Sequence, residues 1–485
     1  MDRSIRWKRA RFGLKRNGSI MGTLSAALGT AGNALTVLEQ AMGVVQNNVA
    51  NASTPGYVTQ TPILTAGAFD PTRGVWGGVQ DSGTQSARNA YAEEAVWSAN
   101  EQVGAATQQA SSLQNLQSIF NISGTSGIPA ALSSLSSAFS AWSTTSDATA
   151  QQQVINAAQG VAQAFNEAAS NAGQIQSQTD QQLQSTINQI NQLSTSIAKL
   201  NGQIRNGAQQ DAGLNAQLYS DLEQLSNLVS INVETQSDGT VTVLMGGQVP
   251  LVIGSSQEAI SVQSGGGTVP DATILTSDGQ DVTRLASNQG QLGGLLQFRN
   301  AVLPTVVGDG AQPGGLNQLA QGVADTVNGL LTSAQVSAGG TGIDLFVYDP
   351  GSPTAVAGSL AVNASFTTAQ LVASNGTAAN GTANQLAQMG DTSIAALGGL
   401  NPTNFYSRIA SDIGTQASSA STAKQTETDV LTQAQNLRAQ LSGVSLNDQA
   451  TNLLQFQQAY QAAAQAIATI RSTMQYFFTS MQQVG

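Results

Sequence analysis

The sequence predicts a mainly α-helical protein with a smaller β region. Long helices at the two ends are expected to pair as a coiled coil, and a central helical domain is expected to carry inserted β-rich segments. Three observations support this class: a heptad pattern of apolar residues near each terminus, helical periodicity through much of the interior, and a period-two pattern that begins at Ile231. The 485 residues are enough for about three domains.

The composition removes most classes of enzyme. The chain contains no histidine and no cysteine, so it has no Ser-His-Asp triad, no imidazole or thiolate metal ligand and no disulfide. Its 28 Asp and Glu residues leave carboxylate chemistry open. Charged residues make up only 9%, against about 25% in ordinary soluble domains. The net charge of −11 argues against nucleic acid as a partner.

Residues 1–20 differ from the rest, because they hold seven basic side chains and one acid. We expect them to be a basic leader, with Met21 as the functional start. A basic segment followed by uncharged residues to Leu38 also fits a cleaved secretory signal, and that interpretation stays open. Only 11 of the 22 residues from Asn17 to Leu38 are apolar. That is too few for a membrane span of about 20 mostly apolar residues, so no membrane insertion is expected.

The first heptad stripe predicts a helix from Leu24 to Val49 that ends before Ser53, because Pro55 disfavours helix at the residue before it. The other faces of this helix carry small residues and amides, which suggests that they meet other protein chains. Those amides are Asn33, Gln40, Gln46, Asn47 and Asn48. The stripe residues expected to carry assembly are Leu28, Leu35, Leu38, Met42 and Val45.

The second stripe lies at the opposite end of the chain and alternates in steps of three and four from Leu453 to Met481. Asn447 is its expected N-cap. Since neither terminal helix has a domain of its own to cover its stripe, we expect the two to pack on each other and to bring the termini together. The expected assembly residues here are Leu453, Phe456, Tyr460, Ile467, Ile470 and Met474.

The interior alternates between helical periodicity, period-two patterns and stretches rich in small residues. Together with the two termini, this divides the chain into seven predicted segments. Residues 183–204 carry one more helical stripe, a hairpin is expected with its turn at Ser237–Gly239, and short strands are expected at 343–347 and 359–362. The segments are 1–20, a basic leader; 21–89, an N-terminal axial helix and its motif; 90–230, the first part of a helical domain; 231–289, a β-rich insertion; 290–337, the helical domain continued; 338–400, a Gly/Ala/Thr-rich irregular or β region; and 401–485, a C-terminal helical segment and axial helix.

No group of residues predicts catalysis, and no cofactor is expected. Glu93 and Glu94 are adjacent and point about 100° apart on a helix, so a solvated face is the expected role. The glycine run at 264–267 lacks the lysine of a phosphate loop and is interpreted as a turn. Asp344 and Asp349 flank a short strand, but two carboxylates alone make a weak metal site.

Two terminal segments carry a resemblance to a known family. Residues 47–57 (NNVANASTPGY) resemble the N-terminal signature of bacterial flagellar axial proteins, which are the rod, hook and hook-associated proteins. Residues 452–462 (NLLQFQQAYQA) resemble their C-terminal signature, and Phe456 in that segment is typical of the hook-associated branch. Residues 293–299 and 214–231 resemble the interior of that branch more loosely. The N-terminal motif residues are Asn48, Asn51, Thr54, Pro55, Gly56 and Tyr57.

The resemblance implies a secreted, non-enzymatic structural protein of the extracellular flagellum, which assembles at the junction of hook and filament. It implies export through the flagellar type III apparatus and a terminal coiled-coil layer that lines the axial channel. The implied partners are further copies in a homo-oligomeric tier, the hook protein, the second junction protein and a type III export chaperone. Another axial protein, either hook or distal rod, remains an alternative, as does a Sec-secreted surface adhesin or carbohydrate-active protein.

Overall fold

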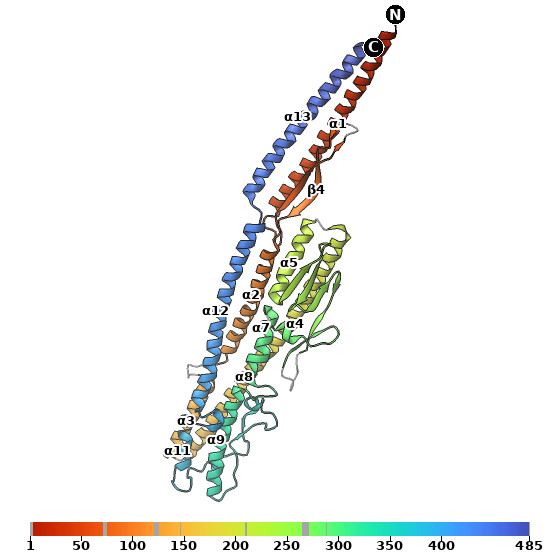
Figure 1. Ribbon diagram of the computed structural model, residues 1–485. Coiled ribbons are helices and arrows are strands. Elements are labelled where there is room, and N and C mark those ends of the chain that lie inside the picture. The colour runs from red at the N-terminus through yellow and green to blue at the C-terminus, as the bar shows by residue number, and fades with distance from the viewer. Residues whose placement is uncertain are drawn as a thin grey trace.

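The computed structural model describes residues 3–70, 75–120, 126–145, 147–208, 211–263, 271–287 and 289–484. It is an elongated molecule in which both chain ends lie together at one tip (Figure 1). Two long helices, α1 (Arg3–Ala50) and α13 (Leu446–Val484), run side by side there and form what we call the terminal pair. The predicted class, a mainly helical protein with paired terminal helices, is confirmed.

The bounds of the two terminal helices differ from expectation. α1 runs continuously from Arg3 through Met21, whereas the apolar stripe predicted a start at Leu24. α13 begins at Leu446, so Asn447 already lies inside it. Ser445 is the residue whose side-chain oxygen accepts a hydrogen bond from the backbone of Asp448, at 3.3 Å. The prediction of Asn447 as N-cap is therefore wrong by two residues.

A β-hairpin that the sequence did not predict follows α1. Its strands β1 (Gln60–Ala66) and β4 (Val79–Ser86) pair antiparallel and pack along α1. The register shifts between Pro62 and Leu64, where proline cannot donate to the strand ladder. Two short strands, β2 (Phe69–Asp70) and β3 (Val75–Trp76), extend the hairpin.

The rest of the molecule, residues 90–442, is called the body. Two of its helices, α2 (Ala90–Gln117) and α12 (Pro402–Ser442), pack lengthwise and continue the line of the terminal pair (Figure 1). The longest helix of the body, α4 (Ala148–Gln203), has 56 residues, which correspond to about 84 Å of helix. It is long enough to link two separate apolar cores. Before and after it lie α3 (Gly127–Thr145), the π-helical turn η1 (Ile204–Ala208) and α5 (Ala212–Leu228).

One core lies between the C-terminal half of α4, helix α5 and a small β unit. The predicted stripe at 183–204 points into this core, and the predicted hairpin forms with Gly239 at φ 82° in its turn. The glycine run at 264–267 lies outside the described residues. The strands are β5 (Ile231–Thr235), β6 (Val241–Met245), β7 (Val249–Ile253) and β8 (Ser256–Gln257) in one sheet, with β9 (Ile260–Gln263) and β10 (Thr273–Thr276) as a second pair.

The other core is the larger one and surrounds the N-terminal half of α4, with Phe139, Trp142 and Phe165 fully buried. The short predicted strands at 343–347 and 359–362 appear as one antiparallel pair, β11 (Phe346–Val347) and β12 (Ala361–Val362). The remaining helical elements are α6 (Thr283–Ala286), α7 (Gly290–Gln297), η2 (Phe298–Val302), α8 (Leu303–Val307), α9 (Gly315–Ser337), α10 (Val356–Ser359), η3 (Thr368–Gln370), α11 (Gly381–Ala387) and η4 (Ala395–Leu397).

Amide side chains on helices hold the β segments in place. The Asn191 side chain donates to the carbonyl of Ile260 at 2.8 Å and accepts from the N–H of the same residue at 3.0 Å. Asn328 does the same to Phe346, at 2.8 and 2.9 Å. Each amide thus replaces a neighbouring strand for one residue, which satisfies backbone groups that would otherwise be buried without partners. Amide side chains of this kind therefore stabilise contacts within the chain.

Candidate assembly site at the base of the terminal helices

The predicted stripe of α13 is the face that this helix turns toward α1. Its residues are half-buried in the single chain, while the residues between them are mostly exposed. The Tyr460 hydroxyl donates to a carboxylate oxygen of Glu39 at 3.0 Å and ties the two helices together. The half-buried residues of the predicted set are Leu453, Phe456, Tyr460, Ile467, Ile470 and Met474.

The buried face of α1 is wider than the predicted stripe. Leu28, Leu35, Leu38 and Met42 are half-buried, and Val45 is buried. The most buried apolar residues of α1 also include two outside the predicted stripe, Val37 and Ala41, whereas its last position, Val49, is 46% exposed. The hairpin explains the difference, because it covers a second face of α1 that the heptad analysis left to solvent or to other chains.

Asn48 of the N-terminal motif is fully buried and makes four hydrogen bonds. Its Nδ2 donates to the carbonyl of Gln60 at 2.8 Å and to Oε1 of Gln449 at 2.9 Å. Its Oδ1 accepts from the N–H of Gln60 and from the hydroxyl of Tyr57, both at 2.9 Å. One amide therefore joins α1, β1 and α13. The expectation that this amide faces another protein chain is wrong for Asn48.

The rest of the motif forms a tight loop against α5. Asn51 donates to Asn47 and accepts from the Thr54 hydroxyl at 3.1 Å, and Pro55 leads into Gly56 at φ 72°. A Cβ on Gly56 would lie 2.2 Å from the backbone oxygen of Ala216. Glycine is therefore required both by its left-handed conformation and by the close approach of α5.

Behind this loop lies a cluster of four charged side chains, which we call the charge cluster. Arg88 and Arg438 both donate to the carboxylate of Glu93, and Arg438 also donates to Glu223 at 2.7 Å. Arg88 further donates to the carbonyl of Gly56 at 2.6 Å. Glu93 is only 1% exposed, so the prediction that it belongs to a solvated helix face is wrong. Its partner Arg438 lies 345 residues away in the sequence, and no local pattern indicates it.

Burial and charge act against each other in the charge cluster. Burial lowers the pKa of the Arg88 guanidinium from its ordinary value, and Glu93 counteracts this. Burial also acts to lower the pKa of Arg438, yet the hydrogen bonds and charges of Glu223 and Glu93 raise it overall. Both arginines stay charged at neutral pH, because a guanidinium is not deprotonated in this range.

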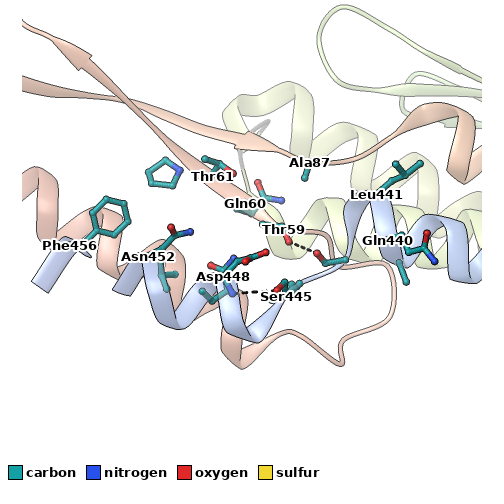
Figure 2. A pocket seen from close by; sticks show the side chains of 16 residues that line it. Thr59, Gln60, Thr61, Ala87, Gln440, Leu441, Ser445, Asp448, Asn452 and Phe456 are labelled. Carbon is teal, nitrogen blue, oxygen red and sulfur yellow. Dashed lines mark hydrogen bonds between the residues drawn. The ribbon is translucent and has the colours of Figure 1, made fainter. Parts of the chain in front are cut away.

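A cavity of about 600 Å³ opens on the other side of the same connections. Figure 2 shows Asp448, Asn452 and Phe456 of α13 along one side of it, and Thr61 of β1 opposite. The Thr59 hydroxyl donates to the carbonyl of Gly443 at 2.8 Å at its edge. The lining mixes apolar and amide groups and holds one carboxylate, a surface suited to packing and hydrogen bonding.

Outward-facing apolar side chains continue along α12 and α13. Among the described residues, seven large ones are between 42% and 77% exposed in the single chain. The apolar stripes did not indicate them, because they lie away from the heptad positions. They are Val430, Leu437, Leu441, Leu446, Leu454, Tyr476 and Phe478.

The described residues hold no group of three or more Asp or Glu arranged to bind a metal ion. The Asp349 carboxylate instead accepts from the backbone N–H of Gly351 at 2.9 Å, within a turn. Within the same described part of the chain, no helix has the length and apolar character that crossing a membrane requires. What the site offers is contact surface.

Comparison with known families gives three matches in order along the chain. A model of the flagella basal body rod protein matches residues 28–57, a model of the helical domain of the flagellar hook-associated protein FlgK matches 113–346, and a model of the C-terminal region of flagellar basal body rod FlgEFG proteins matches 438–477. The first match ends at Tyr57, where the motif loop ends, and the last begins at Arg438 of the charge cluster.

Curated relatives carry the name flagellar hook-associated protein 1. The protein from Escherichia coli strain K12 is 22% identical over 92% of this chain and 98% of its own length, and that from Bacillus subtilis is 27% identical over 91% and 95%. The protein from Salmonella typhimurium is 24% identical over 67% of this chain, and the match spans 59% of that relative's length. A solved structure titled as the flagellar hook junction protein FlgK from Burkholderia pseudomallei is 25% identical, with a TM-score of 0.47, over 52% of this chain and 46% of that one.

Proposed function

We propose that the chain is a member of the family of flagellar hook-associated protein 1 and a structural subunit that self-assembles at the junction of hook and filament. The observation that carries this proposal is the order of the three family matches, with rod-type segments on the two terminal helices and a hook-associated helical domain between them. The interior match favours the junction protein over the hook and distal rod alternatives.

The terminal pair is the proposed assembly element. Its stripe residues are only half-buried in the single chain, and α13 presents further apolar side chains at Leu454, Tyr476 and Phe478. Exposed apolar surface of this extent is typical of a protein interface. Copies packed side by side would cover it and form a closed tier around an axial channel. The outer body would then face solvent.

The proposed partners follow from this position. They are further copies of the chain, the hook protein on one side, the second junction protein on the other, and an export chaperone before assembly. The proposed location is the extracellular flagellum, reached by the flagellar type III apparatus. The proposed role is mechanical connection, without catalysis.

Deletion of the gene in its own bacterium tests the proposal. The deletion strain should make hooks of normal length but no filaments, and filament subunits should accumulate in the medium. Re-expression of the full chain should restore filaments, and antibody labelling should mark one band between hook and filament. Loss of the hooks themselves would indicate a hook or rod protein, and normal filaments would refute a junction role.

A further inference from the structure

The terminal pair and the body meet through three short connections, residues 51–59, 87–89 and 443–445, which together we call the joint. Backbone contacts cross it, since the N–H of Thr59 donates to the carbonyl of Ser442 at 3.0 Å. The N–H of Asn89 donates to the hydroxyl of the same serine at 3.2 Å. These bonds hold the connections of the joint together, and each involves a residue that lies between a helix and the next element or at a helix end.

The apolar clusters of the body do not extend across the joint. Among the described residues, the three apolar clusters of the chain include none before Trp97 and none after Ala420. The buried apolar residues of the terminal pair form no continuous core with the body. On one side of the joint lies the cavity shown in Figure 2. The joint itself is held by close contacts of a few residues, at Gly56 against Ala216 of α5 and at the buried Val58, without a continuous apolar core among the described residues.

The charge cluster contacts the joint from the side of the body. Arg88 belongs to the connection 87–89, Glu93 to α2, Glu223 to α5 and Arg438 to α12, and Arg88 reaches the motif loop through the carbonyl of Gly56. The Arg88 guanidinium also lies 3.6 Å from the ring centre of Tyr219 on α5. Five segments thus converge on two positive and two negative charges.

A cluster of this kind adds little to the free energy of folding, but it restricts how the segments that carry its charges can be arranged. Buried ion pairs add little over apolar packing of the same volume, because desolvation offsets their attraction. Removing one partner, however, leaves a buried charge uncompensated, so arrangements that separate the partners are strongly disfavoured. Arg88 makes the arrangement specific for the joint, because its guanidinium reaches the Glu93 carboxylate and the Gly56 carbonyl together only in the observed geometry.

We propose that the charge cluster of Arg88, Glu93, Glu223 and Arg438 is an orientation lock, which fixes the direction in which the terminal pair leaves the body of each single subunit. The lock operates before any assembly and does not depend on the identity of the neighbouring proteins. A subunit would therefore present its terminal helices at a preset angle.

Distance measurement between two spin labels tests the lock in the full-length chain. Because the chain has no cysteine, the exposed positions Gln224→Cys on α5 and Gln458→Cys on α13 can be labelled selectively. The parent should give a single narrow distance distribution. The net-neutral change Glu93→Gln with Arg438→Gln should remove that narrow peak and give a broad distribution, while the circular dichroism of the body is retained.

A matched control is the ion pair of Arg299 and Asp180, whose Nε and Oδ1 lie 2.9 Å apart within the body. Arg299→Gln with Asp180→Gln removes the same charges and should leave the distribution narrow. If the cluster variant fails to fold, Arg438→Lys keeps the charge and should still broaden the distribution, because one ammonium cannot reproduce the fork of a guanidinium. A broad parent distribution, or a narrow one in the cluster variants, would overturn the proposal.

Discussion

Replacing Asn48 by alanine is expected to loosen the base of the terminal pair while the body stays folded. Asn48 is 0% exposed and supplies both partners of the Gln60 backbone, whose own side chain is 9% exposed. Alanine removes the donor and the acceptor together. The N–H and carbonyl of Gln60 then lose their partners at the point where α1, β1 and α13 meet.

The magnitude follows from the number of groups left without partners. Each buried polar group without a hydrogen bond costs about 1–3 kcal/mol, so the two backbone groups of Gln60 together cost about 2–6 kcal/mol. The Tyr57 hydroxyl is half-buried and can turn to water, so it adds little. Gln449 is only 4% exposed and its side-chain oxygen also loses the Asn48 donor, which adds to the cost. We expect this loss as a lower free energy of local opening of the hairpin and the adjoining helix turns.

Native-state hydrogen exchange followed by mass spectrometry measures that opening. Peptides from residues 41–66 and 446–460 should lose protection in Asn48→Ala, and peptides from the body should not change. Asn47→Ala is the matched control, because Asn47 is exposed on the same helix turn and its side chain contacts only Asn51 among the hydrogen bonds described. Equal protection in the two variants would refute the reasoning about Asn48.

Three further substitutions have defined outcomes. Gly56→Ala places a Cβ 2.2 Å from the Ala216 oxygen. It also puts an L-residue in a left-handed conformation, which costs about 1–2 kcal/mol. Limited proteolysis should therefore cut the motif loop faster, and an unchanged rate would contradict the close packing. Burial raises the pKa of Glu101 from 4.5 to about 7. A raised carboxyl pKa favours the native state only while the group is protonated. The free energy of unfolding should therefore fall by about 3 kcal/mol as the pH rises from about 4.5 to about 7. Glu101→Gln should remove this slope in urea titrations, and a slope that persists would assign it to other groups. Phe456→Ala should cost about half of the 3–5 kcal/mol of a fully buried ring in the single chain, because Phe456 is half-buried there; normal filaments in a strain that carries it would count against its role in assembly.

Local periodicity was sufficient to predict the paired terminal helices and the hairpin of β5 and β6. The stripe on α13 and that hairpin follow from alternation within a few residues, so each could be predicted without knowledge of distant parts. The buried face of α1 is wider than predicted because the hairpin of β1 and β4 covers part of that helix. Residues 60–86 show no clear alternation of apolar and polar residues, and most of the hairpin is exposed.

The candidate site was harder to predict because its contacts join residues far apart in sequence. Glu93 looked like an ordinary surface carboxylate, and only the fold brings Arg438 to it. Asn48 was identified as part of a family motif, but its amide was expected to face another chain, whereas it binds Gln60 and Gln449 of its own chain. Amides are ambiguous in this way, because the same side chain can solvate a surface or satisfy a buried backbone.

The side-by-side position of the two chain ends has a consequence for the order of folding. Asn48 and Gln449, which hydrogen-bond, are 401 residues apart, and closing a flexible loop of that length costs about 5 kcal/mol in chain entropy. Once α2 and α12 have paired, Asn89 and Ser442 are already in contact, and about 40 residues, 51–88 and 443–445, separate the two terminal helices. The entropy cost of closure then falls to about 3 kcal/mol. Folding of the body first therefore lowers the entropy cost of pairing the terminal helices. These helices then pair last, starting at the joint and proceeding toward the two ends of the chain.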